Sequence, residues 1–343
     1  MGGFALRALV TAWLSVVAAS AFAQTPASDT LIAAATQEGT VKWYTSAELS
    51  VVEALGKAFE TKYPGIKVVI ERSGAERNFQ RIDQEYSSGI HQADVVDSSD
   101  ATHFLFWKKD GKLASFTPQT AAYIPARYRD PDGTFASWRS TLSVMAYNTR
   151  LVQPADAPHR FGDLLDAKWS GKLVKAHPGY SGTILTATWE IVRALGWGYL
   201  EKLGTQHVMQ VQSANDPPRK LSLGERAVMV DGVEYTLLAE KARGAPVEPI
   251  YPAEGTPFIV GSLGVMKDAP HPNAARLYAT YLFSHEAQQL LVDRGGLRSL
   301  DPEVKDPAGT TPLSSIKLLA DDPAGTAEHA AEIKQKYQEY FGI

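Results

Sequence analysis

Cysteine is absent from the 343-residue sequence, and charge of one sign does not dominate it. The absence of cysteine excludes disulfide bonds, thiolate metal sites, cysteine nucleophiles and a lipid-modified N-terminal cysteine. Lys and Arg number 34 against 38 Asp and Glu, a formal net charge of −4. No stretch of clustered Lys or Arg forms a basic stripe, so we expect no nucleic-acid partner.

Long apolar runs are also scarce, since the sequence has one only near its start. There, Arg7 precedes an apolar stretch that reaches about Ala19, and Ala21-Phe22-Ala23 follows. A positive charge, a short apolar segment and an A-x-A site are typical of a cleaved secretory signal. Residues 1–23 are therefore predicted to be a signal peptide, and the mature chain, beginning near Gln24, is predicted to be exported and soluble.

The signatures of common metal and nucleotide sites are missing as well. The sequence contains no H-E-x-x-H motif, no EF-hand loop and no dense cluster of His and Asp. It contains neither G-x-G-x-x-G after a predicted strand nor G-x-x-x-x-G-K. These patterns mark zinc, calcium, dinucleotide and nucleotide-phosphate sites. We therefore expect no resident cofactor.

What the sequence does contain is an alternation of strand-like and helix-like segments. Residues 40–46, 66–73 and 93–99 read as buried strands, and amphipathic helical patterns separate them. A similar alternation recurs from about 140 to 250, beginning with "WRSTLSVMAYNT", which reads as one long strand. Such alternation favours parallel sheets covered by helices on both faces. The predicted fold class is α/β, with two Rossmann-like lobes.

Small hydroxyl-bearing residues stand where the predicted strands end. In open α/β sheets, ligands bind beyond the carboxyl ends of the strands. The resulting candidate ligand-binding residues are Thr45, Ser46, Ser73, Ser98 and Ser99 in the first half, and Ser181, Gly182, Thr183, Glu234 and Tyr235 in the second.

Two interpretations of these turns remain open. Thr45-x-x-Glu48 and Ser73-x-x-Glu76 fit the capping box, in which side chains satisfy free N–H groups at a helix start. Alternatively, a helix N-terminus that follows Ser181-Gly182-Thr183 offers N–H groups, hydroxyls and the positive end of the helix dipole to an anion. The glycine there lets a ligand approach the backbone closely.

A serine hydrolase would use the same turn for a different purpose. Its nucleophile elbow reads G-x-S-x-G, whereas residues 179–183 read G-Y-S-G-T, so the final glycine is replaced by threonine. His207, His271 and Asp231 are the available partners for a Ser181 triad.

Two arginines are candidates for pairing with an anionic ligand. Arg72 ends the second predicted strand, where its guanidinium could bind a carboxylate or phosphate in bidentate fashion. The alternative is a surface ion pair with Glu76. Arg139, next to Trp138, is a weaker candidate of the same kind.

With these positions assembled, the chain resembles the extracellular solute-binding proteins of ABC importers. It most resembles the branch that binds ferric ion, phosphonates, sugar phosphates and thiamine. The resemblance covers nearly all of the mature chain and lies in residues 41–68, residues 87–100, Tyr147-Asn148-Thr149, the Ser-Gly-Thr turn and "APHPNAARLYATYLFSHEAQQLL" at 269–291.

The resemblance implies the type II periplasmic binding fold, with hinge strands joining two lobes around a ligand cleft. The lobes are predicted at 24–135 plus 253–300 and at 136–252 plus 301–343, with crossings near 135–147 and 250–258. The resemblance also implies a periplasmic monomer that is not an enzyme. Its expected partners are a small-molecule solute and an inner-membrane ABC permease.

The ligand implied by the resemblance is a small anionic or zwitterionic solute of phosphonate, sugar phosphate or carboxylate type. The alternative is Fe³⁺ as transported ligand, because the family's iron ligands fall on Glu48, about Ser99, and Glu234-Tyr235 in this chain. Two carboxylates and a phenolate could hold a hard cation. Buried carboxylates would repel a pure anion unless the ligand also carried an amine, hydroxyls or a metal.

Overall fold

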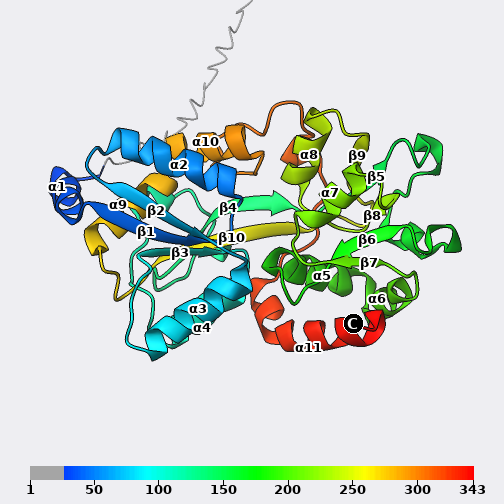
Figure 1. The fold of residues 1–343 in the computed structure, drawn as a ribbon, viewed down its shortest axis with the longest axis horizontal. Helices are drawn as coiled ribbons and strands as arrows, with labels where there is room; N and C mark the ends of the chain where they lie inside the picture. The colour runs from blue at the N-terminus through cyan, green and yellow to red at the C-terminus, as the bar shows by residue number, and fades with distance from the viewer. Residues whose placement is uncertain (1–26) are drawn as a thin grey trace, which may run out of the picture.

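The computed structural model describes residues 27–343, and the predicted signal peptide lies outside them. The described chain contains two five-stranded sheets, one in each half of the molecule (Figure 1). Their strand orders are β2-β1-β3-β10-β4 and β7-β6-β8-β5-β9. Helices cover both faces of each sheet, which confirms the predicted α/β class with two lobes.

The first sheet has a parallel part and an antiparallel part. β1 (Thr40–Thr45) lies parallel between β2 (Lys67–Arg72) and β3 (Val95–Ser98), whereas β10 (Phe258–Val265) runs antiparallel to β3 and to β4 (Ala136–Leu142). The helices of this half are α1 (Asp29–Glu38), α2 (Leu49–Lys62), α3 (Ala75–Ser87), α4 (Ala101–Lys109), α9 (Pro272–Leu282) and α10 (His285–Gly295).

The second sheet is built in a similar way. β6 (Leu173–Ala176) lies parallel between β7 (Met209–Val211) and β8 (Val228–Met229), and β5 (Met145–Asn148) runs antiparallel to β8 and to β9 (Val247–Ile250). The accompanying helices are α5 (Gly182–Leu195), α6 (Trp197–Gly204), α7 (Asp216–Ser222), α8 (Glu234–Ala242) and α11 (Pro323–Phe341).

The chain passes between the two sheets from β4 to β5 and from β9 to β10, at residues 143–144 and 251–257. The boundary predicted after residue 135 is therefore misplaced. β4 pairs with β10 in the first sheet, and only the residues after it reach the second. The expected long strand over 138–149 is in fact two strands in different sheets, because Ser143 and Val144 interrupt the pairing.

Both lobes have a buried apolar core, and one cluster of buried residues runs from the first lobe into the second. In the first, the Trp43 ring packs edge-on against Trp138 and Tyr278, with centroids 5.5 and 5.4 Å apart, in the geometry that aromatic quadrupoles favour. In the second, Leu173 and Tyr337 are fully buried. No helix in residues 27–343 is long and apolar enough to cross a membrane.

Candidate functional site

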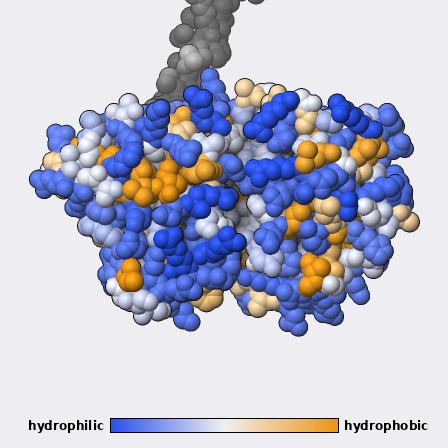
Figure 2. Space-filling view, in the orientation of Figure 1, coloured by the Kyte–Doolittle hydropathy of each residue, from blue (hydrophilic) through white to orange (hydrophobic). Residues whose placement is uncertain are grey.

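A cleft of about 510 Å³ separates the two lobes, and most of the residues that line it are polar. Figure 2 shows the molecule hollowed between its halves, with largely hydrophilic residues beside the hollow. Both lobes contribute to the lining, which consists of Ser46, Arg72, Gly74, Ala75, Glu76, Arg77, Gln80, Ser99, Arg139, Gly179, Tyr180, Ser181, Gly182, Thr183, Gln212, Ser213, Ala214, Asn215, Asp216, Tyr235 and Lys334.

The Ser-Gly-Thr turn, which the sequence analysis gave as a candidate anion site, lies at the start of α5. Ser181 is the N-cap, and its Oγ accepts a hydrogen bond from the Ile184 N–H at 3.4 Å. The N–H groups of Gly182 and Thr183 precede the first intrahelical bonds and are therefore free for another acceptor. Ser181 thus caps its helix and lines the cleft at once, so the two interpretations of this turn are compatible.

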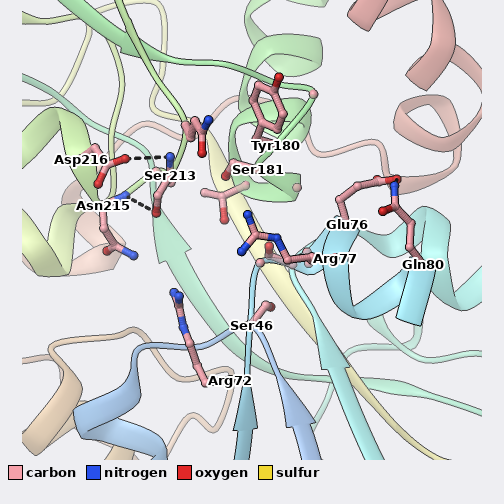
Figure 3. Close-up of a pocket in the computed structure, with 18 of the residues that line it drawn as sticks. Ser46, Arg72, Glu76, Arg77, Gln80, Tyr180, Ser181, Ser213, Asn215 and Asp216 are labelled. Atoms are coloured by element: carbon pink, nitrogen blue, oxygen red, sulfur yellow. Dashed lines mark hydrogen bonds between the residues drawn. The ribbon is translucent and has the colours of Figure 1, made fainter. Parts of the chain in front are cut away.

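The start of α3 faces the same cleft from the first lobe (Figure 3). Its N-cap is Gly74, which has no side chain to cap the first N–H groups. A capping box from Ser73 to Glu76 is therefore absent. The box from Thr45 to Glu48 is absent too, because Glu48 is itself the N-cap of α2 and the Thr45 hydroxyl accepts from the Ala47 N–H.

Four cationic side chains line the cleft against two carboxylates, an excess of two positive charges. The Arg72 Nε donates to the carbonyl of Ala47 at 3.2 Å, and the alternative ion pair with Glu76 does not form, since Glu76 pairs with His103 and Lys334. The Arg77 side chain makes no hydrogen bond or ion pair within residues 27–343, and Figure 3 shows it beside Ser181. The other two cations, Arg139 and Lys334, are paired with carboxylates.

Both lining carboxylates already have partners. Glu76 lies 3.6 Å from His103 Nε2 and 3.6 Å from Lys334 Nζ, and the interaction with His103 lowers the pKa of Glu76 to about 2. Asp216 accepts a hydrogen bond from the Ser213 N–H at 2.9 Å. Neither carboxylate pairs with Arg72 or Arg77, so these two arginines are available to a ligand.

Tyr235, at the start of α8, completes the polar lining. Burial raises the pKa of its phenol, and the nearby Arg139 partly offsets this effect. The phenol consequently stays protonated near neutral pH and can donate a hydrogen bond to an anion.

The sequence matches a known protein family over most of its length. The family model described as "Bacterial extracellular solute-binding protein" matches residues 43–289, well over half of the chain. The chain belongs to this family. "Probable ABC transporter periplasmic-binding protein y4fP" of Sinorhizobium fredii is 24% identical over 279 residues, 78% of this chain and 76% of that protein.

Solved structures agree with this solute-binding protein in fold. The periplasmic binding protein AfuA of Actinobacillus pleuropneumoniae, described with exogenous fructose-6-phosphate bound, has a TM-score of 0.81 at 24% identity, over 89% of this chain and 99% of that one. Iron-bound HitA of Pseudomonas aeruginosa has a TM-score of 0.76 at 21% identity. The match covers 87% of this chain and 99% of HitA. The predicted family, a type II periplasmic binding protein of ABC importers, is confirmed. Family and similar structures are transport binding proteins, not enzymes.

Seven of the predicted site residues line the cleft of the solute-binding protein: Ser46, Arg72, Ser99, Ser181, Gly182, Thr183 and Tyr235. Thr45, Ser73, Ser98 and Glu234 do not. Ser98 is turned inward, with its hydroxyl 2.9 Å from His103 Nδ1. Glu234 is 1% exposed and forms a bidentate ion pair with Arg298, at 2.9 and 3.0 Å.

The residues of the iron alternative do not converge. Glu234 is held by Arg298 and by the Tyr251 hydroxyl, whereas Tyr235 faces the cleft. Glu48 lies 3.9 Å from Arg219 and outside the lining. Among residues 27–343, no group of three or more His, Asp and Glu side chains is arranged to hold a metal ion.

The hydrolase triad is not assembled either. No histidine bonds to the Ser181 hydroxyl in the described part of the chain. Asp231 is buried in an ion pair with Lys175, and His271 lies 2.9 Å from Asp94 in the first lobe. Asp231 and His271 are thus committed to other partners.

Several lining residues were not predicted from the sequence, notably Arg77, Gln80, Gln212, Asn215, Asp216 and Lys334. Residues 212–216 follow β7, so the rule that ligands lie beyond strand ends could have found them. β7 spans only three residues and gives a weak strand signal. Arg77 and Lys334 lie inside helices, where no strand end marks them.

Proposed function

We propose that this solute-binding protein is the periplasmic receptor of an ABC importer for a small organic anion that carries a phosphate or phosphonate group. The proposal rests mainly on one observation: the N-termini of two helices, one from each lobe, line the same cationic cleft. The first N–H groups of α3 come from one lobe and those of α5 from the other. Arg72, Arg77 and the Thr183 hydroxyl lie beside them.

Charge and hydrogen bonding both favour an oxyanion with several oxygens. Helix N-termini attract anions through free N–H groups and through the helix dipole. Arg72 and Arg77, the two lining cations without a carboxylate partner in the described chain, match a dianion better than a singly charged carboxylate. Guanidinium groups bind phosphate oxygens in bidentate fashion, which adds geometric selection.

The rest of the ligand would meet amide, hydroxyl and carboxylate groups. Gln80, Gln212, Ser213 and Asn215 line the cleft, and Asp216 offers a negative charge to an amine. A hydroxylated or amine-bearing remainder, as in a sugar phosphate or an aminophosphonate, suits this lining. The similarity to AfuA, a protein described with fructose-6-phosphate bound, supports the sugar phosphate type.

Capture would occur by closure of the two lobes on the solute, with the strand crossings as hinges. A ligand held by groups of both lobes binds the closed state better than the open state and so shifts the population toward it. The closed form would then deliver the solute to the membrane permease. No covalent step is required, and the described residues contain no assembled nucleophile and base at Ser181.

Ferric iron is the second candidate, favoured by the fold similarity to iron-bound HitA and by Tyr235 in the cleft. Phenolate oxygen is a hard ligand suited to Fe³⁺. The iron would be cargo, held by Tyr235 together with a synergistic anion at the two helix starts. The engagement of Glu234 with Arg298 makes this candidate the weaker one.

Thermal unfolding of the ligand-stripped mature chain separates the two candidates. The panel holds fructose 6-phosphate, 2-aminoethylphosphonate, thiamine, small carboxylates, and ferric citrate with and without EDTA. A ligand present at 100 times its Kd stabilises the folded state by about 2.7 kcal/mol, several degrees in Tm. We expect a shift with a phosphate or phosphonate that EDTA leaves unchanged. A shift with ferric citrate alone, abolished by EDTA, would replace the proposal by the iron candidate.

A further inference from the structure

Arg139 occupies an unusual position at the floor of the cleft. It lies on β4, one of the strands that lead from one lobe to the other, and is only 5% exposed although it lines the cleft. Its Nη2 donates to Asp97 Oδ1 at 3.0 Å and to the Ser46 hydroxyl at 3.1 Å. Asp97 is fully buried at the end of β3, so the guanidinium is held from one side by a fixed carboxylate.

The neighbouring strand leaves room for this guanidinium. A Cβ atom at Gly261 would lie 2.8 Å from Arg139 Cζ and 2.9 Å from its Nε, distances that real side chains do not show. The pairing of β10 with β4 also shifts register between Gly261 and Ser262. The glycine and this irregularity let the arginine lie flat against the backbone of β10.

The hydrogen bonding of the pair is incomplete within the described chain. Arg139 Nε and Asp97 Oδ2 are buried without a partner, and Arg139 Nη1 makes no hydrogen bond to residues 27–343. Buried polar atoms are rarely left unpaired, so such cases call for a functional explanation. Nη1 is the donor left for an oxyanion in the cleft, because Nε is too buried to meet a ligand.

We propose that Arg139 is a specificity-determining residue that contacts the phosphate or phosphonate group, and that Asp97 is the residue that positions it. This inference rests on the proposed function. Because the charge of Arg139 is already balanced by Asp97, its contribution to binding is the fixed direction of the hydrogen bonds that its planar guanidinium donates. Lysine, a single ammonium on a flexible stem, cannot reproduce two donors in one plane.

The test measures binding of inorganic phosphate and of fructose 6-phosphate to wild type, Arg139→Lys, Arg139→Gln and the control Arg150→Gln. Arg150 is exposed and does not line the cleft, so its substitution makes the same change in net charge as Arg139→Gln. We expect both Arg139 variants to bind at least tenfold more weakly, by the same factor for both ligands, because the contact is to the group they share. The control should bind like the wild type.

Asp97 variants distinguish positioning from a merely structural role. Asp97→Asn keeps an oxygen that accepts from Arg139 and should leave phosphate affinity within about threefold of wild type, since the arginine remains in place. Asp97→Ala removes the acceptor and should weaken binding about tenfold. Near-ultraviolet circular dichroism, to which the neighbouring Trp138 contributes, verifies that each variant retains native aromatic packing.

The outcomes separate the inference from the proposed function. If the wild type binds neither inorganic phosphate nor any phosphate ester or phosphonate, the proposed function fails and this assignment fails with it. If the wild type binds and Arg139→Lys binds equally well, only the assignment of Arg139 is overturned. A loss confined to fructose 6-phosphate would place Arg139 against the sugar and also overturn it.

Discussion

Gly182 of the second lobe lies directly against Asp100 of the first. A Cβ atom built on Gly182 would stand 2.7 Å from Asp100 Cβ and 2.8 Å from Asp100 N. Asp100 cannot withdraw easily, because it is the N-cap of α4 and its carboxylate accepts from the Thr102 N–H at 2.9 Å. The lobes can therefore approach this closely only with glycine at position 182.

Gly182→Ala should hold the lobes apart and weaken ligand binding at least tenfold. Gly198→Ala is the matched control, because Gly198 also lies in a helix and a Cβ there meets no atom within 4 Å. The Tm without ligand should change by less than about 3 °C in both variants, since neither lobe core is altered. Calorimetry measures the affinity, and wild-type binding by Gly182→Ala would show that closure does not need this contact.

Removing each of the two hydroxyls of the Ser-Gly-Thr turn should have a different effect, one on stability and the other on ligand binding. Ser181→Ala removes a helix cap and should lower the free energy of unfolding by about 1 kcal/mol. Thr183 caps nothing, so Thr183→Ala should leave stability unchanged and weaken anion binding about tenfold, the effect of one charge-assisted hydrogen bond. Urea unfolding and calorimetry of both variants provide the readouts. Unaltered affinity in the double variant would leave capping as the only role of this turn.

Glu190 connects α5 to the beginning of β10 and should make stability depend on pH. Its Oε2 accepts from the Phe258 N–H at 3.1 Å, its Oε1 is unpartnered, and burial raises its pKa well above 4.5. Between 4.5 and this raised pKa, the folded state binds more protons than the unfolded state, so this group lowers stability as pH rises.

Glu190→Gln keeps the acceptor without the charge and should raise the free energy of unfolding at pH 7.5 by about 1–3 kcal/mol. The difference from wild type should vanish near pH 4, where the glutamate is protonated in both states. Urea unfolding at the two pH values checks this. A variant less stable than wild type at pH 7.5 would show that the charged form is the one the fold requires.

The buried ion pair of Lys175 and Asp231 lies against α5 and is hydrogen-bonded to it. Both side chains are within 1% of complete burial, and Lys175 also donates to Thr188 of α5 at 3.1 Å. Lys175→Met would leave Asp231 buried without its partner and should cost about 3–5 kcal/mol of stability. The double variant with Asp231→Leu should recover most of this loss. Equal destabilisation of the single and double variants, measured by urea unfolding, would contradict this account.

The fold could be predicted largely because buried strands and amphipathic helices alternate in the sequence. The boundary between lobes was missed, since β4 and β5 are both fully buried and only Ser143 and Val144 separate them. No Gly or Pro marks the point at which the chain changes sheets, and a strand that continues into another sheet has the same local pattern as a single long strand.

Site residues at the ends of strands could be predicted from the sequence. Those whose access to the cleft depends on the orientation and packing of helices could not. Ser46, Arg72 and Ser181 follow strands and reach the cleft. Glu234 and Tyr235 are neighbours on α8, but successive helical residues point about 100° apart, so only the tyrosine faces the cleft. Lys334 is distant in sequence from the rest of the lining and reaches it only because α11 packs against both α5 and α4.

The most direct measurement is a calorimetric titration of the ligand-stripped mature chain. Fructose 6-phosphate, 2-aminoethylphosphonate and ferric citrate are titrated separately at pH 8, with and without EDTA, into wild type and Thr183→Ala. The account predicts that a phosphate or phosphonate binds the wild type at a ratio of one to one, indifferent to EDTA, and binds Thr183→Ala about tenfold more weakly. Saturable heat from ferric citrate alone, lost in EDTA, would contradict it.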